Sequence, residues 1–240
     1  MKYILLLNII IFSVCVNAQT KISFPSKDGL DISADFYEGE KDNPYILLFH
    51  QAGSSRGEYK EIGKKLVQLG FNCLAVDLRS GKESNYVVNE TAKLASEKGL
   101  AQEYIDTKKD IEAAIEYAFE KNKKQVVLFG SSYSASLSLV LALKNEKVQG
   151  VVAFSPGEFF KPSLDINQEI KGFDKPVFIA SSQREYPYVF EYDAAITSKI
   201  KTFFKPQNGQ GEHGAKSLWK NCETNKEYWL ALMLFLKQFN

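Results

Sequence analysis

The stretch from Gln125 to Leu143 constrains the fold of this chain more than any other. It begins with the apolar run 126–129, turns at Gly130, and passes through small residues into a second apolar run, 137–143. A short apolar run that ends at a glycine is typical of a buried strand, and a longer one after a turn is typical of a buried helix. The stretch therefore predicts a strand, a sharp turn and a helix, with Ser132 at the apex of the turn.

The residues around Ser132 form a G-x-S-x-S pattern, from Gly130 to Ser134. A serine held at a tight turn from strand to helix projects its hydroxyl clear of the sheet, which suits a nucleophile. The pattern that usually marks such a turn is G-x-S-x-G, so Ser134 stands where the second glycine is expected. Serine is also a good helix N-cap, so this stretch alone leaves both interpretations of Ser132 open.

The first 18 residues, Met1–Ala18, are typical of a secretory signal peptide. Lys2 provides a positive start, an apolar run follows, and small residues precede Gln19. The apolar run is too short to span a bilayer comfortably, although an uncleaved N-terminal anchor is an alternative. Cleavage predicts a secreted or periplasmic protein with one large domain, residues 19–240.

The charge balance and the cysteine pattern limit the possible partners. The chain has 30 basic and 29 acidic side chains, so loss of Lys2 makes it neutral, and nothing favours nucleic acid or an anionic membrane surface. Cys73 and Cys222 remain after cleavage, without a CxxC motif or a histidine-rich cluster. The sequence predicts no metal site and no organic cofactor, and whether these two cysteines pair stays open.

The rest of the chain alternates between strand and helix patterns. Asp28-Gly29 separates two alternating runs, 21–24 and 30–37, which predicts an antiparallel hairpin. Further strands are expected at 44–49, 71–78, 148–154, 175–180 and 202–204. Further helices are expected at 59–69, 104–120 and 228–239.

This alternation predicts an α/β fold with a mostly parallel central sheet, an antiparallel N-terminal hairpin and helices on both faces. Only 156–174 separates the two late strands, which leaves no room for a large cap. The segment 80–102 is long enough to cover the mouth of a site.

Both histidines of the chain fall where strands are expected to end. His50 directly follows an apolar strand, and His213 lies in the loop after the last strand. Chemistry in such sheets collects at the carboxyl ends of the strands. An imidazole can take the proton of a nearby serine and return it to a leaving group, so His213 is a candidate base for Ser132.

Four motifs in this order resemble the α/β-hydrolase superfamily, in particular its compact dienelactone-hydrolase-like and serine-peptidase-like branches. They are His50-Gln51-Ala52-Gly53, Asp77-Leu78-Arg79-Ser80-Gly81, Gly130-Ser131-Ser132-Tyr133-Ser134 and His213-Gly214. The resemblance covers most of residues 21–240 and implies the chain order Ser…acid…His.

The resemblance also implies roles for single residues. Ser132 would be the nucleophile and His213 the general base. The backbone N–H of Tyr133, with that of Gln51 or Ala52, would form the oxyanion hole, which stabilises charge that develops in the transition state. His50 would shape the loop without transferring protons.

The acid of this set is expected just after the penultimate strand, where the chain has Glu185. Glutamate can orient a histidine as aspartate does. Glu158, after the preceding strand, is the competing candidate, and Glu185 is favoured. Glu185 could alternatively be a solvated surface charge beside Arg184.

Only three of the basic residues are arginines: Arg56, Arg79 and Arg184. All three are expected in loops at strand carboxyl ends. Arginine binds carboxylates through two parallel hydrogen bonds, so one or more of them could contact an anionic group of a substrate. The alternative is that Arg79 and Arg184 brace loops.

Taken together, these features predict an exported serine hydrolase that cleaves a small or polar ester through an acyl-enzyme intermediate. A peptidase or amidase with the same residues is one alternative, and a non-catalytic ligand-binding protein is another. The expected partner is a small-molecule ester or a short peptide, with no nucleic acid and no stable membrane span after cleavage. The oligomeric state is not predicted.

Overall fold

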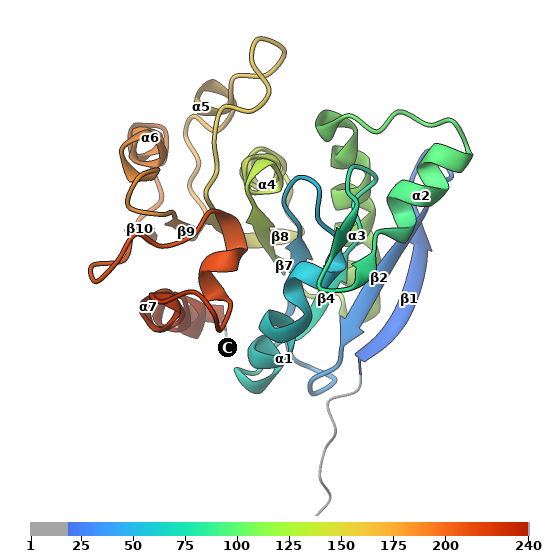
Figure 1. Cartoon of the computed structure of the whole chain (residues 1–240), viewed down its shortest axis with the longest axis horizontal. Helices are drawn as coiled ribbons and strands as arrows, with labels where there is room; N and C mark the ends of the chain where they lie inside the picture. Colours follow the sequence, from blue (N-terminus) through green and yellow to red (C-terminus); the bar gives the residue numbers. More distant parts are fainter. Residues whose placement is uncertain (1–18, 240) are drawn as a thin grey trace, which may run out of the picture.

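The structure, a computed structural model, describes residues 19–239. The expected signal peptide, Met1–Ala18, lies outside the described residues. Within residues 19–239, an eight-stranded sheet forms the centre of the molecule and helices cover both of its faces (Figure 1). No helix in this part of the chain is both long and apolar enough to cross a membrane.

The strand order of the sheet is β1-β2-β4-β3-β7-β8-β9-β10. β1 pairs antiparallel with β2, β2 pairs antiparallel with β4, and all other neighbours are parallel. This confirms the α/β fold with a mostly parallel sheet and an antiparallel N-terminal hairpin. The strands are β1 (Gln19–Pro25), β2 (Asp31–Tyr37), β3 (Tyr45–Phe49), β4 (Asn72–Val76), β7 (Val126–Ser131), β8 (Val148–Phe154), β9 (Val177–Ala180) and β10 (Lys201–Phe204).

Successive side chains of the central strands pack against opposite faces of the sheet, because side chains alternate along a strand. In β7, Leu128 joins the apolar cluster on one face, while Val127 and Phe129 join the cluster on the other. Every residue of β3, β4 and β7 is buried, which explains why their sequences are mostly apolar.

The two faces of the sheet are covered by different helices. α1 (Lys60–Gln68) and α7 (Asn225–Leu236) cover one face. The opposite face carries α2 (Glu90–Glu97), α3 (Lys108–Asn122), α4 (Tyr133–Leu143), α5 (Ile166–Glu169) and α6 (Tyr186–Val189). In Figure 1, α4 lies above the sheet, and α1 and α7 lie below it. Short 3₁₀ helices are η1 (Arg56–Tyr59), η2 (Tyr104–Thr107), η3 (Phe190–Ala194), η4 (Gly214–Leu218) and η5 (Lys237–Phe239).

The segment 80–102 has more structure than its sequence predicts. It contains a small hairpin, β5 (Glu83–Ser84) and β6 (Val87–Val88), followed by α2. The Asn89 side chain accepts a hydrogen bond from the Ala92 N–H and caps α2. α2 packs on β2, where the Ser33 N–H donates to Thr91 Oγ1 (2.9 Å). Strands of two residues are too short to produce a periodic pattern, so the sequence could not reveal this hairpin.

The segment between β8 and β9 contains only the four-residue helix α5, so no large cap covers the sheet. The loops that follow β3, β7, β9 and β10 all leave the carboxyl edge of the sheet, because these strands are parallel. The side chains of the candidate site follow these strands and therefore lie close together at this edge.

Candidate active site

Ser132 lies alone between the end of β7 and the start of α4, with φ 62° and ψ −125°. A positive φ is costly for a residue with a side chain, so the turn must be held by its surroundings. The Ser132 N–H donates to the Phe154 carbonyl (2.8 Å), which ties the turn to β8. A Cβ at Gly130 would collide with the backbone of Ala135, so only glycine allows strand and helix to approach this closely.

Ser134, which replaces the second glycine of the usual pattern, stabilises the turn through its hydroxyl. Ser134 Oγ donates to the Phe49 carbonyl at the end of β3 (2.7 Å) and accepts from the Ser131 N–H (3.0 Å). The side chain is fully buried and its hydrogen-bonding capacity is used. A serine in place of the usual glycine therefore links the turn to β3.

The structure brings Ser132, His213 and Glu185 into a continuous chain of hydrogen bonds. His213 Nε2 lies 2.8 Å from Ser132 Oγ, and His213 Nδ1 lies 2.5 Å from Glu185 Oε1. The three residues come from the loops after β7, β10 and β9. A serine, an imidazole and a carboxylate in this order are suited to nucleophilic catalysis, because the imidazole can accept the serine proton and the carboxylate can stabilise the resulting cation.

Ser155 joins this group, although the sequence did not single it out. Its hydroxyl donates to Glu185 Oε2 (2.8 Å) and accepts from the N–H of Gly214 (2.9 Å), the residue after His213. The Ser182 N–H also donates to Glu185 Oε2 (3.1 Å). Burial alone would raise the pKa of Glu185, but hydrogen bonds from His213, Ser155 and Ser182 lower it to about 2. Glu185 is therefore ionised at neutral pH.

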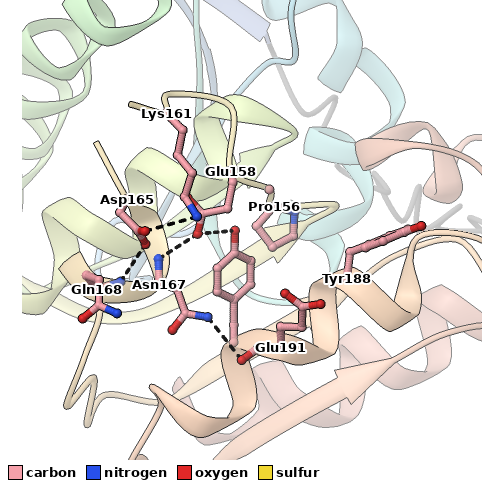
Figure 2. A pocket seen from close by; sticks show the side chains of 10 residues that line it. Pro156, Glu158, Lys161, Asp165, Asn167, Gln168, Tyr188 and Glu191 are labelled. Atoms are coloured by element: carbon pink, nitrogen blue, oxygen red, sulfur yellow. Dashed lines mark hydrogen bonds and ion pairs between the residues drawn. The ribbon is translucent and has the colours of Figure 1, made fainter. Parts of the chain in front are cut away.

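Glu158, the competing candidate for the acid, lies elsewhere. Its carboxylate accepts the N–H groups of Ile166 (2.8 Å) and Asn167 (2.9 Å) at the start of α5. It lines a cavity of about 470 Å³ between this segment and Tyr188 of α6 (Figure 2). Of the two glutamates, Glu185 is the one bonded to His213.

His50 is fully buried and fixes the peptide that follows Gln51. The Leu78 N–H donates to His50 Nε2 (3.0 Å), so the ring proton sits on Nδ1, which donates to the Gln51 carbonyl (2.8 Å). Burial lowers the pKa of His50, which keeps the ring neutral. Because a trans peptide holds its C=O and N–H on opposite sides, the Ala52 N–H points away from His50.

Glu58, in η1, fixes the preceding peptide. The Gln51 N–H donates to Glu58 Oε2 (3.0 Å) inside the protein, where only 1% of Glu58 is exposed. This corrects the expectation that Gln51 could supply an oxyanion donor, because its N–H is already bonded. In the described residues, the N–H groups of Ala52 and Tyr133 have no acceptor, and Tyr133 is the first residue of α4. We call residues 50–58, from His50 to Glu58, the oxyanion loop.

Two of the three arginines are not available to a substrate. Arg56 forms ion pairs with Asp35, Asp77 and Glu90. Arg79, which is fully buried, forms ion pairs with Asp28 and Asp110. The hypothesis that these two side chains contact an anionic substrate is therefore wrong: carboxylates of the protein already occupy both guanidinium groups. Arg184 is exposed and has no ion pair in the described part of the chain.

Cys73 and Cys222 are both buried free thiols, so they do not pair with each other. Burial raises the pKa of Cys73, which keeps this thiol protonated. Among residues 19–239, no group of three or more histidine, cysteine, aspartate or glutamate side chains is arranged to hold a metal ion.

Comparison with known proteins identifies relatives by sequence family and by fold. The family model described as "Dienelactone hydrolase family" matches residues 33–204, more than half of the chain. A search of curated proteins found no match.

Solved structures with this fold include three hydrolases. The esterase Pf2001 of Pyrococcus furiosus has a TM-score of 0.66 at 15% identity, over 92% of this chain and 93% of that one. A dienelactone hydrolase of Anabaena variabilis has a TM-score of 0.68 at 15% identity, over 92% and 98% of the two chains. The esterase domain of a Rhodothermus marinus protein has a TM-score of 0.61 at 14% identity, over 92% and 99%. At these identities, the likeness establishes the fold.

Proposed function

The chain belongs to the dienelactone hydrolase family, and from this premise we propose that it is an exported serine hydrolase that cleaves a small or polar ester through an acyl-enzyme intermediate. One observation carries the proposal: Glu185, His213 and Ser132 are joined by two hydrogen bonds, of 2.5 and 2.8 Å. The strained backbone of Ser132 supports it as well, because such strain persists where a residue must be presented in one orientation.

In the first half of the reaction, Ser132 Oγ attacks the ester carbonyl carbon while its proton moves to His213 Nε2. Negative charge then develops on the former carbonyl oxygen, and the free N–H groups of Tyr133 and Ala52 are the donors that we assign to it. Glu185, ionised because its pKa is lowered to about 2, stabilises the imidazolium. Collapse of the intermediate breaks the ester C–O bond, and the alcohol leaves with the proton from His213.

In the second half, a water molecule gives a proton to His213 Nε2 and attacks the acyl carbon of the Ser132 ester. The C–O bond to Ser132 breaks, Oγ recovers the proton, and the carboxylic acid departs. The same groups thus serve both halves, and the atoms balance as ester plus water to acid plus alcohol.

The access to the site supports a small or polar substrate. No cap domain separates the site from solvent, and the His213 side chain is 45% exposed. Long acyl chains need an enclosed apolar pocket, and an open site offers them little burial. Export is the remaining part of the proposal, and it rests on the signal-like sequence of residues 1–18.

One experiment tests the nucleophile, the base and export together. The full-length chain is expressed in a secreting host, and the exported protein is treated with a fluorophosphonate and digested for mass spectrometry. We expect an N-terminal peptide that begins at Gln19 and an adduct on Ser132. The adduct should be absent in Ser132→Ala and at least about 100-fold slower in His213→Ala, because general-base catalysis contributes about 10²–10⁴.

Hydrolysis of p-nitrophenyl esters and aminoacyl anilides is measured on the same samples. Faster turnover of short-chain esters is the expected result, and preference for anilides would assign a peptidase instead. A folded wild-type protein that forms no adduct would contradict the proposal and favour a ligand-binding role for the fold. An intact N-terminus in the exported fraction would contradict cleavage.

A further inference from the structure

A second cavity, of about 450 Å³, lies beside the oxyanion loop. Three separate segments line it: the end of η1 with the adjoining part of α1, the turn between β5 and β6, and the residues after η4. We propose that this cavity binds a small organic anion with a ring-shaped body, either an aromatic carboxylate or an acidic sugar. The side chains that carry the proposal are Lys60, Lys64, Lys220, Tyr86 and Trp219, none of which takes part in the proposed hydrolysis.

The positive charge of the cavity comes from lysines that have no partner. In the described residues, the ammonium groups of Lys60, Lys64 and Lys220 make no ion pair and no hydrogen bond. Two glutamates also line the cavity, the exposed Glu61 and the buried Glu58, so one positive charge remains in excess. Unpaired cations that face one concave surface attract an anion, whereas both buried arginines already have carboxylates.

The backbone of Tyr86 adopts a positive φ, which is unfavourable for a residue with a side chain, and its ring stays exposed to solvent. Asn85 and Tyr86, the two central residues of the β5–β6 turn, have φ values of 48° and 62°. Such turns favour asparagine followed by glycine, because both central residues need a positive φ. Tyr86 is 97% exposed, so its ring contributes nothing to the apolar core that would offset the strain. An exposed aromatic ring held in a strained turn is consistent with a role in binding.

The turn that carries Tyr86 is fixed to η1. Asn85 Nδ2 donates to the Gly57 carbonyl (2.9 Å), and Ser55 Oγ donates to the Val87 carbonyl (2.6 Å). A Cβ at Gly57 would collide with Ser84 and Val87, so the hairpin packs directly on the backbone of η1. The backbone that carries Tyr86 is therefore fixed before a ligand binds, and ordering it costs little entropy on binding.

Trp219 supplies a second ring, and the orientation of this one is fixed. Its Nε1 donates to the Glu58 carbonyl (2.9 Å), which fixes the plane of the indole at the wall of the cavity. The cavity thus combines the oriented indole of Trp219 and the exposed ring of Tyr86 with three ammonium groups that make no ion pair in the described residues. Flat ring faces suit the body of an aromatic acid or a sugar, and the ammonium groups suit its acidic group.

The test uses NMR on the wild-type chain, which has only two tryptophans and therefore two indole N–H signals. The signal of Trp219 is assigned by its loss in Trp219→Phe, and the buried Trp229 serves as internal reference. The probes are 2-naphthoate and glucuronate, with 2-naphthamide and glucose as neutral counterparts. These probes contain no ester, so the outcome does not depend on the proposed hydrolysis.

We expect at least one anionic probe to shift the Trp219 signal saturably and leave Trp229 unmoved, with at least tenfold weaker binding of its neutral counterpart. Binding should weaken as salt is raised, because the lysines are exposed. Each of Lys60→Gln, Lys64→Gln and Lys220→Gln should reduce the affinity about two- to fivefold. Lys171→Gln is the control, since Lys171 is also exposed and unpaired but lies far along the chain, outside the cavity lining.

Tyr86→Gly separates binding from folding. Glycine tolerates the positive φ at this position, so thermal stability should stay equal or rise, while affinity falls at least fivefold. The probe that binds distinguishes an aromatic acid from an acidic sugar as the preferred class. The proposal is overturned if neither anion shifts Trp219, if the neutral counterparts bind equally well, or if the lysine and Tyr86→Gly variants retain full affinity.

Discussion

Ser155 shows how a single hydroxyl can set the geometry of two other residues. It bonds Glu185 on one side and the backbone beside His213 on the other, and its own φ is 50°. The carboxylate and the imidazole are thereby held by one buried group. Ser155 touches no reacting atom in the proposed mechanism, so we regard it as a positioning residue.

Removal of this hydroxyl should reduce kcat by about tenfold or more and leave KM nearly unchanged, because the Gly214 N–H and Glu185 each lose a partner. Ser155→Ala and Ser155→Gly form a matched pair, measured by steady-state ester hydrolysis and urea unfolding. Both lack the hydroxyl, but glycine tolerates the positive φ, so Ser155→Gly should be the more stable and the two should be equally impaired. A Ser155→Gly protein with full kcat would contradict the assignment.

The pH dependence of stability also reports on Ser155, because its hydroxyl donates a hydrogen bond to Glu185. The pKa of Glu185 is lowered from its ordinary value to about 2, so its ionised form stabilises the fold above about pH 4.5. That contribution is lost as the pH falls from 4.5 toward 2. Ser155→Ala removes one of the lowering hydrogen bonds, so the loss should begin at a higher pH than in the wild type.

At the scale of single residues, the sequence was informative where the chemistry requires particular side chains. Ser132, His213 and Glu185 follow predicted strands, and the structure joins them. It allowed that Arg79 braces a loop, but it could not identify the partners of Arg56 and Arg79, because these lie at positions 28, 35, 77, 90 and 110, which no local pattern connects. Ser155 and Glu58 were missed for the same reason.

At the scale of elements, the oxyanion loop depends on side chains instead of regular secondary structure. The peptide on each side of Gln51 is held by a buried side chain, Glu58 before it and His50 after it. The position of the Ala52 N–H is thus determined by residues that need not contact the substrate.

Glu58→Ala should reduce kcat for the ester that the wild type cleaves by about tenfold, less than the 10²–10³ that follows loss of an oxyanion donor itself. Glu58→Gln keeps an oxygen acceptor for the Gln51 N–H and should stay within about threefold of the wild type. The exposed Glu38→Ala is the control. Equal losses in Glu58→Gln and Glu58→Ala would show that the carboxylate charge, and not the hydrogen bond, is what matters.

The elements themselves were largely predictable, since the central strands are continuous apolar runs and α1, α3 and α4 have clear patterns. The hairpin of β5 and β6 was not, because its conformation comes from contacts with η1 and not from its own two-residue strands. α2 was missed as well: its apolar face is short, with Ala92 and Ala95 as its buried apolar residues.

At the scale of the whole molecule, Arg79 joins three distant parts of the chain. Its guanidinium group binds Asp28 in the turn between β1 and β2, and Asp110 in α3, while Arg79 itself follows β4. Asp110 is fully buried, so it would be left as an unpaired charge without the arginine.

Arg79→Met should therefore destabilise the protein by about 3–5 kcal/mol, measured by urea unfolding at pH 8. The loss should be smaller at pH 5, because burial already raises the pKa of Asp110 and the carboxyl can take up a proton when the arginine is absent. Arg184→Met, at an exposed and unpaired arginine, should change stability by less than about 0.5 kcal/mol. Equal stability of the two variants would contradict the role of the Arg79 cluster.

The order of the strands also determines when, during folding, the proposed reaction centre can assemble. The groups of the proposed reaction centre lie at positions 132, 185 and 213 and follow three different strands, with β8 between two of them. They can meet only after β7, β8, β9 and β10 have paired, and contacts between segments so far apart form slowly. A chain still emerging from the ribosome, or threading through a translocation channel, therefore carries an ordinary serine. In the exported hydrolase that we propose, Ser132, His213 and Glu185 would therefore come together only after translocation, on the far side of the membrane.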